Sequence, residues 1–298
     1  MRIARAIVVV ALLIVVTLRA DADMPLSGPA AFADRLYVLD CGVGHAADQS
    51  RWSAGVNQGK PIDISVSCYL IRHGRQYFLW DTGISDHVAT MSQGWLRGTN
   101  PAADILWRRK NTLAAQLAEL KVAPADVTYV GLSHSHPDHI GNAELFPGSM
   151  LLLQRAEAEF FFRETPDGAA GTMPPGDPLP ALSKGHRMQL VDEDLDVFGD
   201  GSIVIVWTPG HTPGHQSCLV HLQKTGWILL SGDAVHLQTN WDNRRLPYFT
   251  RLSMEAKMQT ALSMQRMADL LAFYHARLWI VHDKVQSDGL KHAPAYYE

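Results

Sequence analysis

The chain has 298 residues, of which 47% are hydrophobic and 19% are charged. These proportions are typical of a globular protein with a sizeable core, and they exclude a largely disordered chain. The formal net charge is −4 at pH 7. An acidic chain without a run of basic residues does not attract nucleic acid, so we expect no nucleic-acid partner.

The N-terminus is typical of a secretory signal peptide. A basic start, Arg2 and Arg5, precedes an unbroken apolar run, Ala6–Val16, followed by the small residues that signal peptidase reads. The run is shorter than the roughly 20 apolar residues that span a membrane, so we expect no stable membrane association after cleavage. An uncleaved anchor is the alternative. We therefore expect a signal peptide at residues 1–22 and one periplasmic or secreted domain at residues 23–298.

Short segments rich in Val, Ile, Leu and aromatic residues predict strands along the whole chain. Two segments, Thr112–Leu120 and Ser253–Tyr274, repeat apolar residues at helical spacing, and Ser253 suits a helix N-cap. Two long stretches, Ser85–Lys110 and Thr165–Gly185, are predicted to be loops. Strands that mix with helices without strict alternation favour packed sheets with helices outside. The predicted strands are Leu36–Cys41, Ser65–Ile71, Tyr77–Asp81, Thr128–Ser133, Met150–Leu153, Ser202–Trp207, Gln216–Leu222, Trp227–Ser231 and Leu278–Val281.

The three cysteines, Cys41, Cys68 and Cys218, lie in apolar, strand-like segments. Buried and inert thiols are the default interpretation. A disulfide between two of them would suit an oxidising compartment. The odd number leaves at least one free unless it pairs between chains.

The strongest chemical signal is HSHPDH, which follows an apolar run and occupies residues 134–139. Alternate residues of an extended segment point the same way, so His134 and His136 can reach one metal ion together. The proline prevents a regular continuation, and the turn can carry Asp138 and His139 toward a second metal ion. Imidazole and carboxylate groups are the ligands that zinc accepts in a catalytic site.

Three further candidates each follow an apolar run, where a strand would deliver them to one edge of a sheet. They are His211, Asp233 and His282. Together with the HSHPDH segment they provide enough ligands for two metal ions with positions left for water and substrate. The seven candidate metal ligands are His134, His136, Asp138, His139, His211, Asp233 and His282.

HSHPDH, TPGHTPGH at residues 208–215, SGDA at 231–234 and VHD at 281–283 resemble the metallo-β-lactamase superfamily, as does the early Asp81-Thr82-Gly83 turn. The similarity runs from about residue 35 to about residue 285. It implies an α/β fold, an αββα sandwich with the metals at one edge. It also implies one zinc at His134, His136 and His211, a second at Asp138, His139 and His282, and Asp233 as the bridge between them.

Within the superfamily, the chain is most similar to the N-acyl-homoserine lactonases. That group commonly has a Tyr near the substrate carbonyl, three residues after the bridging Asp, where this chain has His236. A histidine can still donate a hydrogen bond, so we predict a catalytic role for His236, with an incidental loop residue as the alternative. His211 and His215 compete for one ligand position, and the resemblance favours His211. Asp81 and His215 are expected to bind no metal themselves and to orient the ligand side chains by hydrogen bonds.

The resemblance predicts a hydrolase with two zinc ions per chain, or other divalent metals, that opens a lactone ester with a metal-bridging hydroxide. Asp138, the carboxylate nearest the hydroxide, would carry the proton to the leaving oxygen. The expected substrates are N-acyl-homoserine lactones, which makes the expected activity quorum quenching. Aromatic residues in the predicted loops can line an acyl pocket or anchor the loops to the core: Trp95, Trp107, Trp241, Tyr248 and Phe249.

Other activities share this fold. Asp233 disfavours a β-lactamase, which generally lacks the bridging Asp. The C-terminal tail is poor in basic residues, which disfavours a glyoxalase II-like thioesterase. A phosphotriesterase remains an alternative, as does a binding protein that has lost activity, although the complete ligand set disfavours the latter. The oligomeric state is left open, a homodimer included.

Overall fold

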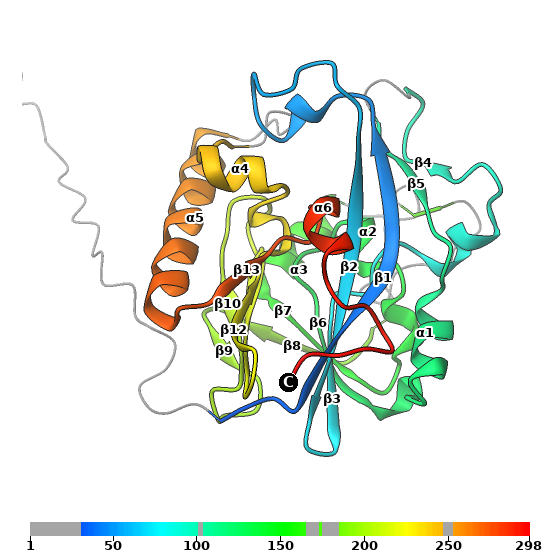
Figure 1. Ribbon diagram of the computed structural model, residues 1–298, viewed down its shortest axis with the longest axis vertical. Helices are drawn as coiled ribbons and strands as arrows, with labels where there is room; N and C mark the ends of the chain where they lie inside the picture. Colours follow the sequence, from blue (N-terminus) through cyan, green and yellow to red (C-terminus); the bar gives the residue numbers. More distant parts are fainter. Residues whose placement is uncertain (1–30, 101–103, 165–172, 175–184, 247–252) are drawn as a thin grey trace, which may run out of the picture.

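In the computed structural model, the two sheets of the protein face each other and helices cover both outer sides (Figure 1). The predicted signal peptide lies outside the described residues, so its cleavage and a domain that starts at residue 23 remain predictions. Among the described helices, none is long and apolar enough to cross a membrane. The described residues are 31–100, 104–164, 173–174, 185–246 and 253–298.

Within the described part of the chain, the larger sheet has eight strands in the order β4-β5-β1-β2-β3-β6-β7-β8. Its centre is the long antiparallel pair β1–β2, in which Leu36 lies opposite Ile71. From β3 onward, β6, β7 and β8 pair in parallel. The strands are β1 Arg35–Ala46, β2 Ile62–His73, β3 Gln76–Trp80, β4 Trp95–Leu96, β5 Leu106–Arg108, β6 Val127–Gly131, β7 Met150–Gln154 and β8 Met188–Val191.

The smaller sheet has the order β13-β12-β11-β10-β9. Strands β10 and β12 both run antiparallel to β11, and β13 runs parallel to β12. The carboxyl ends of β10, β12 and β13 therefore meet at one edge of the sheet. The strands are β9 Leu195–Asp196, β10 Ile203–Trp207, β11 Gln216–Leu222, β12 Gly226–Leu230 and β13 Arg277–Trp279.

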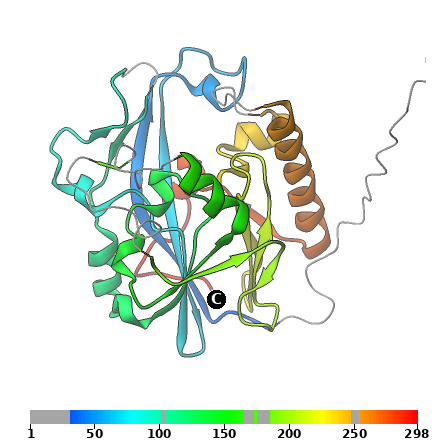
Figure 2. The same cartoon turned by 180° about the vertical axis from the view of Figure 1, so that it is seen from behind.

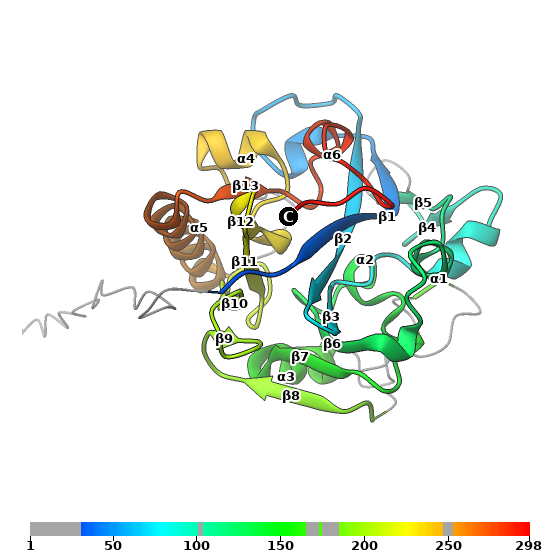
Figure 3. The ribbon, with the colours of Figure 1, turned by 60° about the horizontal axis from the view of Figure 1, so that its bottom comes forward.

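Alternation along the strands explains the layers. In β1, Val38 packs between the two sheets, whereas Leu39 packs on the opposite face with residues of α1. In β10, Ile205 faces the other sheet and Val206 packs against α5. Strands with both faces covered are apolar on both faces. Figures 2 and 3 show the resulting helix–sheet–sheet–helix order, which confirms the predicted αββα sandwich. The helices are α1 Leu113–Glu119, α2 Pro137–Ile140, α3 Arg155–Glu164, α4 Gln238–Asn243, α5 Met254–Tyr274 and α6 Lys284–Asp288.

Helix α5 begins as predicted, because the Ser253 hydroxyl accepts a hydrogen bond from the backbone N–H of Ala256. The predicted loop at 85–110 is wrong in part. It contains a 3-10 helix, Asp86–Thr90, and the strands β4 and β5, of which β5 pairs with the edge of β1. These strands have two and three residues, too short for an alternating pattern to be recognised. The other predicted loop, 165–185, lies mostly outside the described residues.

Cys41 in β1 and Cys68 in β2 form a disulfide. The default interpretation of free thiols is therefore wrong for these two cysteines, and the alternative of a disulfide between two of the three is confirmed. The default interpretation holds for Cys218, which is free and buried in β11.

Candidate metal centre

Four of the seven predicted ligands lie just beyond the carboxyl ends of strands. His134 follows β6, His211 follows β10 and His282 follows β13. Asp233 lies after β12 in a short 3-10 turn, Gly232–Ala234. The parallel directions of β10, β12 and β13 bring three of these residues to one edge. There they meet His134 from the other sheet.

The short helix α2 supplies the other three predicted ligands. His136 is its N-cap residue, and Pro137 occupies the first helical position, where its fixed φ suits a helix start. Asp138 and His139 follow in the only turn of α2. The proline thus starts a helix, and that helix turns the next two side chains toward the metal edge.

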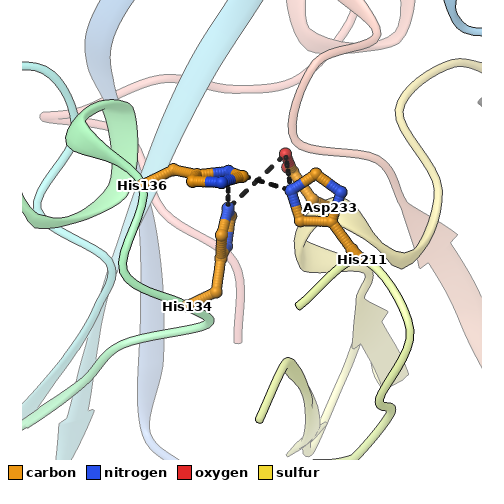
Figure 4. Close-up of side chains that lie close together, drawn as sticks. All are labelled: His134, His136, His211 and Asp233. Atoms are coloured by element: carbon orange, nitrogen blue, oxygen red, sulfur yellow. Dashed lines mark hydrogen bonds and ion pairs between the residues drawn. The ribbon is translucent and has the colours of Figure 1, made fainter. Parts of the chain in front are cut away.

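His134, His136 and His211 converge with Asp233 as the first ligand group (Figure 4). His136 Nδ1 lies 2.8 Å from His134 Nε2 and 3.0 Å from His211 Nε2. Asp233 Oδ2 lies 3.2 Å from His211 Nε2. Four ligand atoms within 4.8 Å of one another can surround a single ion.

Asp138, His139 and His282 form the second ligand group. Asp138 Oδ2 lies 3.6 Å from His139 Nε2 and 3.4 Å from His282 Nε2. The other oxygen of Asp233, Oδ1, lies 3.2 Å from His139 Nε2 and 3.1 Å from His282 Nε2. Asp233 therefore directs one carboxylate oxygen to each group, as expected of a bridging ligand.

Two of the buried ligand atoms, His139 Nε2 and Asp233 Oδ1, lie 3.2 Å apart, but neither forms a well-directed hydrogen bond with the other or with another described residue. Buried polar atoms without partners are rare and call for an explanation. Cations satisfy both atoms, and imidazole and carboxylate donors suit zinc and similar divalent metals. The residues present therefore fit a pair of divalent metal ions.

Burial lowers the pKa of His134 and of His211 well below the ordinary histidine value, and it lowers the pKa of His136 to about 4. Burial also opposes a charge on His139, but the nearby carboxylates, Asp233 above all, outweigh it and raise the pKa of that imidazole. A neutral imidazole is the form that binds a metal ion. The first group is thus electrostatically ready to bind a cation at neutral pH.

Asp81 orients a residue of the second group, His139, by a hydrogen bond from the ring nitrogen that faces away from the other ligands. Its carboxylate accepts a hydrogen bond from His139 Nδ1 at 2.8 Å, and from the backbone N–H and hydroxyl of Ser133 at 2.6 and 2.8 Å. Asp81 has a φ of +56°, a strained conformation for a residue other than glycine. His282 Nδ1 similarly donates to the backbone carbonyl of Ser65 at 2.7 Å. The sequence analysis predicted that Asp81 orients a ligand, but no motif indicated a role for Ser65 or Ser133.

His215 lies beneath the bridging carboxylate rather than in either ligand group. Its Nε2 accepts a hydrogen bond from the backbone N–H of Asp233 at 2.7 Å, and its Nδ1 donates to the carbonyl of Thr208 at 3.0 Å. A Cβ at Gly232 would lie 2.6 Å from His215 Nε2, so the close approach requires glycine. The remaining histidines belong to neither group: His45, His73, His87, His186, His221, His275 and His292.

A pocket of about 300 Å³ opens onto both ligand groups. His236 lies in its wall, is 2% exposed and places Nε2 3.1 Å from Asp233 Oδ2. Its ring stacks on that of His282, with centroids 5.7 Å apart. The rest of the wall combines apolar and charged side chains: Arg51, Trp52, Ile64, Arg97, Asp104, Ile105 and Trp107.

The aromatic residues predicted for an acyl pocket have different positions. Trp107 lines the pocket, and Trp95 is buried opposite it in the β4–β5 pair. Trp241 packs instead with the apolar cluster beneath α5. Tyr248 and Phe249 lie outside the described residues.

Residues 61–274 match the family model of the metallo-beta-lactamase superfamily. The chain belongs to this superfamily. Among its curated relatives, the N-acyl homoserine lactonase AttM of Azorhizobium caulinodans is 34% identical over 271 residues, which covers 89% of this chain and 98% of the relative. AttM of Agrobacterium fabrum is 32% identical over 270 residues, covering 88% and 98%.

Among solved structures, an N-acyl homoserine lactone hydrolase with the product N-hexanoyl-L-homoserine at its catalytic metal centre superposes with a TM-score of 0.73. It is 23% identical, and the match covers 90% of this chain and 100% of that chain. At this identity, the likeness shows the metallo-β-lactamase fold alone. This superfamily fold implies binding of divalent metal, and the present member is a metal-dependent hydrolase.

Proposed function

We propose that this protein is an N-acyl-homoserine lactonase with two zinc ions per chain and quorum-quenching activity. The observation that carries the proposal is the position of Asp233, with one oxygen facing each ligand group. A complete pair of groups joined by a carboxylate suits two-metal hydrolysis. The lactonase names of the relatives that match this chain over nearly all of their length support the choice of substrate.

When bound, the two ions would lower the pKa of a water molecule toward neutrality and polarise the ester carbonyl. Hydrolysis then joins the water oxygen to the carbonyl carbon, breaks the ring C–O bond and moves one proton to the leaving oxygen. Asp138 lines the pocket, and its side chain is 12% exposed. We infer that Asp138 takes up that proton and passes it to the alkoxide, which gives the open hydroxy acid.

The pocket walls suit a lactone that carries an acyl chain. Trp52, Ile64, Ile105 and Trp107 provide apolar surface for the chain. His236 lies beside the ligand groups, where an N–H can donate to the lactone carbonyl or the leaving oxygen as charge develops. The same position near Asp233 also allows His236 to orient the bridging carboxylate.

Purified mature protein should hydrolyse N-hexanoyl and N-dodecanoyl homoserine lactones. It should hydrolyse a β-lactam, a thioester and paraoxon orders of magnitude more slowly or not at all. Titration of released acid measures each rate, and elemental analysis of protein prepared without chelator should find two metal ions per chain. A faster reaction with one of the other substrates would reassign the activity. A metal content near zero with activity retained would overturn the two-metal proposal.

We also propose that the protein is exported and that residues 1–22 are removed. The disulfide between Cys41 and Cys68 supports an oxidising compartment. Mass spectrometry of the protein from the periplasmic or secreted fraction should place the first residue at Asp23. An intact N-terminus would indicate an anchor instead.

A further inference from the structure

A buried carboxylate outside the two ligand groups, that of Glu157 in α3, contacts two loops at once. Its Oε1 accepts hydrogen bonds from the backbone N–H of Ser135 at 2.8 Å and from the Ser135 hydroxyl at 2.6 Å. Its Oε2 accepts from the Thr212 hydroxyl at 2.6 Å and from the backbone N–H of Gly214 at 3.2 Å. The carboxylate thus joins the HSHPDH segment to the segment that follows β10.

Both loops carry ligands of the first group. Ser135 lies between His134 and His136, and Thr212 directly follows His211. One loop extends from the larger sheet and the other from the smaller sheet, so Glu157 connects the two sheets at the metal edge. A Cβ at Gly214 would lie 2.2 Å from the backbone nitrogen of Glu157, so the second loop packs directly on α3.

The carboxylate of Glu157 is kept in the interior without a cation. The residue is 0% exposed, and the donors that contact its carboxylate in the described part of the chain are neutral backbone and hydroxyl groups. Burial raises the pKa of Glu157, while the four hydrogen bonds oppose that rise. A buried carboxylate is costly unless it is hydrogen-bonded, and here four donors from the two loops satisfy it. An apolar side chain in its place would leave those buried donors without an acceptor. The carboxylate thus contributes four directed hydrogen bonds that fix the positions of the two loops relative to each other.

The ring of His211 depends on its backbone more than the rings of His134, His139 and His282 do. The Nδ1 atoms of His139 and His282 donate hydrogen bonds, and Nδ1 of His134 lies 3.1 Å from the hydroxyl of Ser133. The Nδ1 atom of His211 is buried and has no hydrogen-bond partner in the described part of the chain. The orientation of its ring is therefore set by the loop that Glu157 holds.

We propose that Glu157 is a positioning residue for the three-histidine half of the metal centre. By fixing the distance between the two loops, it sets the affinity for the ion at His134, His136 and His211. This inference rests on the two-metal centre proposed above. Substitution of a residue that hydrogen-bonds a metal ligand and fixes its orientation typically lowers metal affinity by about 10- to 100-fold.

The test is the variant Glu157→Gln in the full mature protein. The amide keeps the size of the side chain, but its NH₂ faces donors on one of the two loops, so up to two hydrogen bonds are lost. Zinc affinities measured by competition with a chromophoric chelator should fall about 10- to 100-fold for one ion and stay within about threefold for the other. Glu159→Gln, at an exposed position of the same helix, should leave both affinities unchanged.

Cobalt(II) substitution identifies the weakened half. The spectrum of Glu157→Gln with one cobalt should match that of His211→Ala, which removes a ligand of the same half directly. Two milder variants, Ser135→Ala and Thr212→Val, each remove one hydroxyl contact. We expect them to weaken the same ion by less, with little further loss when combined with Glu157→Gln.

Normal affinity for both ions in Glu157→Gln, or an equal loss of both, would show that Glu157 only stabilises the core. If that variant does not fold, normal affinity in both hydroxyl variants would overturn the proposal. A parent protein that binds no metal would instead refute the proposed metal centre itself.

Discussion

At the residue scale, Asp233 is the only predicted ligand whose two oxygens face different groups among the described residues. Asp233→Ala should lose at least one ion per chain and at least about 100-fold in turnover, because the bridge and its charge are both removed. Elemental analysis and turnover of N-hexanoyl homoserine lactone measure the two effects. Asp242→Asn, at an exposed position of α4, is the matched control. Near-normal turnover in Asp233→Ala would show that Asp233 is not a ligand.

His236 allows a second prediction at this scale. If its imidazole donates to the substrate, His236→Phe should lower turnover by about 100- to 1,000-fold while both metal ions stay bound. His236→Tyr should restore part of the activity, because a phenol also donates. Turnover is to be measured only after metal content has been confirmed.

The other results for His236 have distinct meanings. Loss of metal in His236→Phe would indicate that the imidazole orients Asp233, whose Oδ2 lies 3.1 Å from Nε2. Impairment of both variants with full metal content would indicate a function that needs an imidazole, such as proton transfer near neutral pH. If His236→Phe is as active as the parent, the residue has no catalytic role.

At the scale of elements, the disulfide ties β1 to β2 beneath the Asp81 turn. A Cβ at Gly83 would lie 2.4 Å from Cys41 Cβ, so this turn packs directly on the disulfide. The two cysteines are 27 residues apart, and closing a loop of that length stabilises a protein by about 3.5 kcal/mol. Cys68→Ser should therefore lower the free energy of unfolding by about that amount, as measured by urea denaturation.

The matched control for this prediction is chemical. Once dithiothreitol has reduced the buried disulfide, the free energy of unfolding of the parent should fall by the same amount as in Cys68→Ser. Dithiothreitol should leave the free energy of unfolding of Cys68→Ser unchanged. A substitution without effect on stability would mean that the two thiols are not bonded in the protein.

At the scale of the whole molecule, the metal centre joins the two sheets. One sheet supplies the HSHPDH segment, and the other supplies His211, Asp233 and His282. Ions that bind only the folded state stabilise it, by about 2.7 kcal/mol when the free ion is at 100 times its dissociation constant. Removal of metal with a chelator should lower Tm, and zinc should restore it, as followed by circular dichroism. An unchanged Tm after verified removal of metal would contradict this prediction.

Much of this architecture could be predicted because its signals are local. β11 and α5 match the predicted ranges closely, since a short run rich in apolar residues and helical spacing each appear within a single segment. Helix α3 was not predicted, and neither were the short β4 and β5. The two short strands form by pairing at the edge of the larger sheet, and an edge partner is not visible in a local pattern.

The sequence by itself determined the chemistry of the metal centre. The kinds of ligand, their spacing in HSHPDH and their positions after strands follow from covalent order and strand direction. Only the tertiary structure decided which oxygen of Asp233 faces which group, that Cys41 pairs with Cys68, and that Glu157 joins two ligand loops. The physical reason is that these contacts connect segments from different strands and sheets. Their partners are set by how the layers pack, and no periodicity within one segment records that packing.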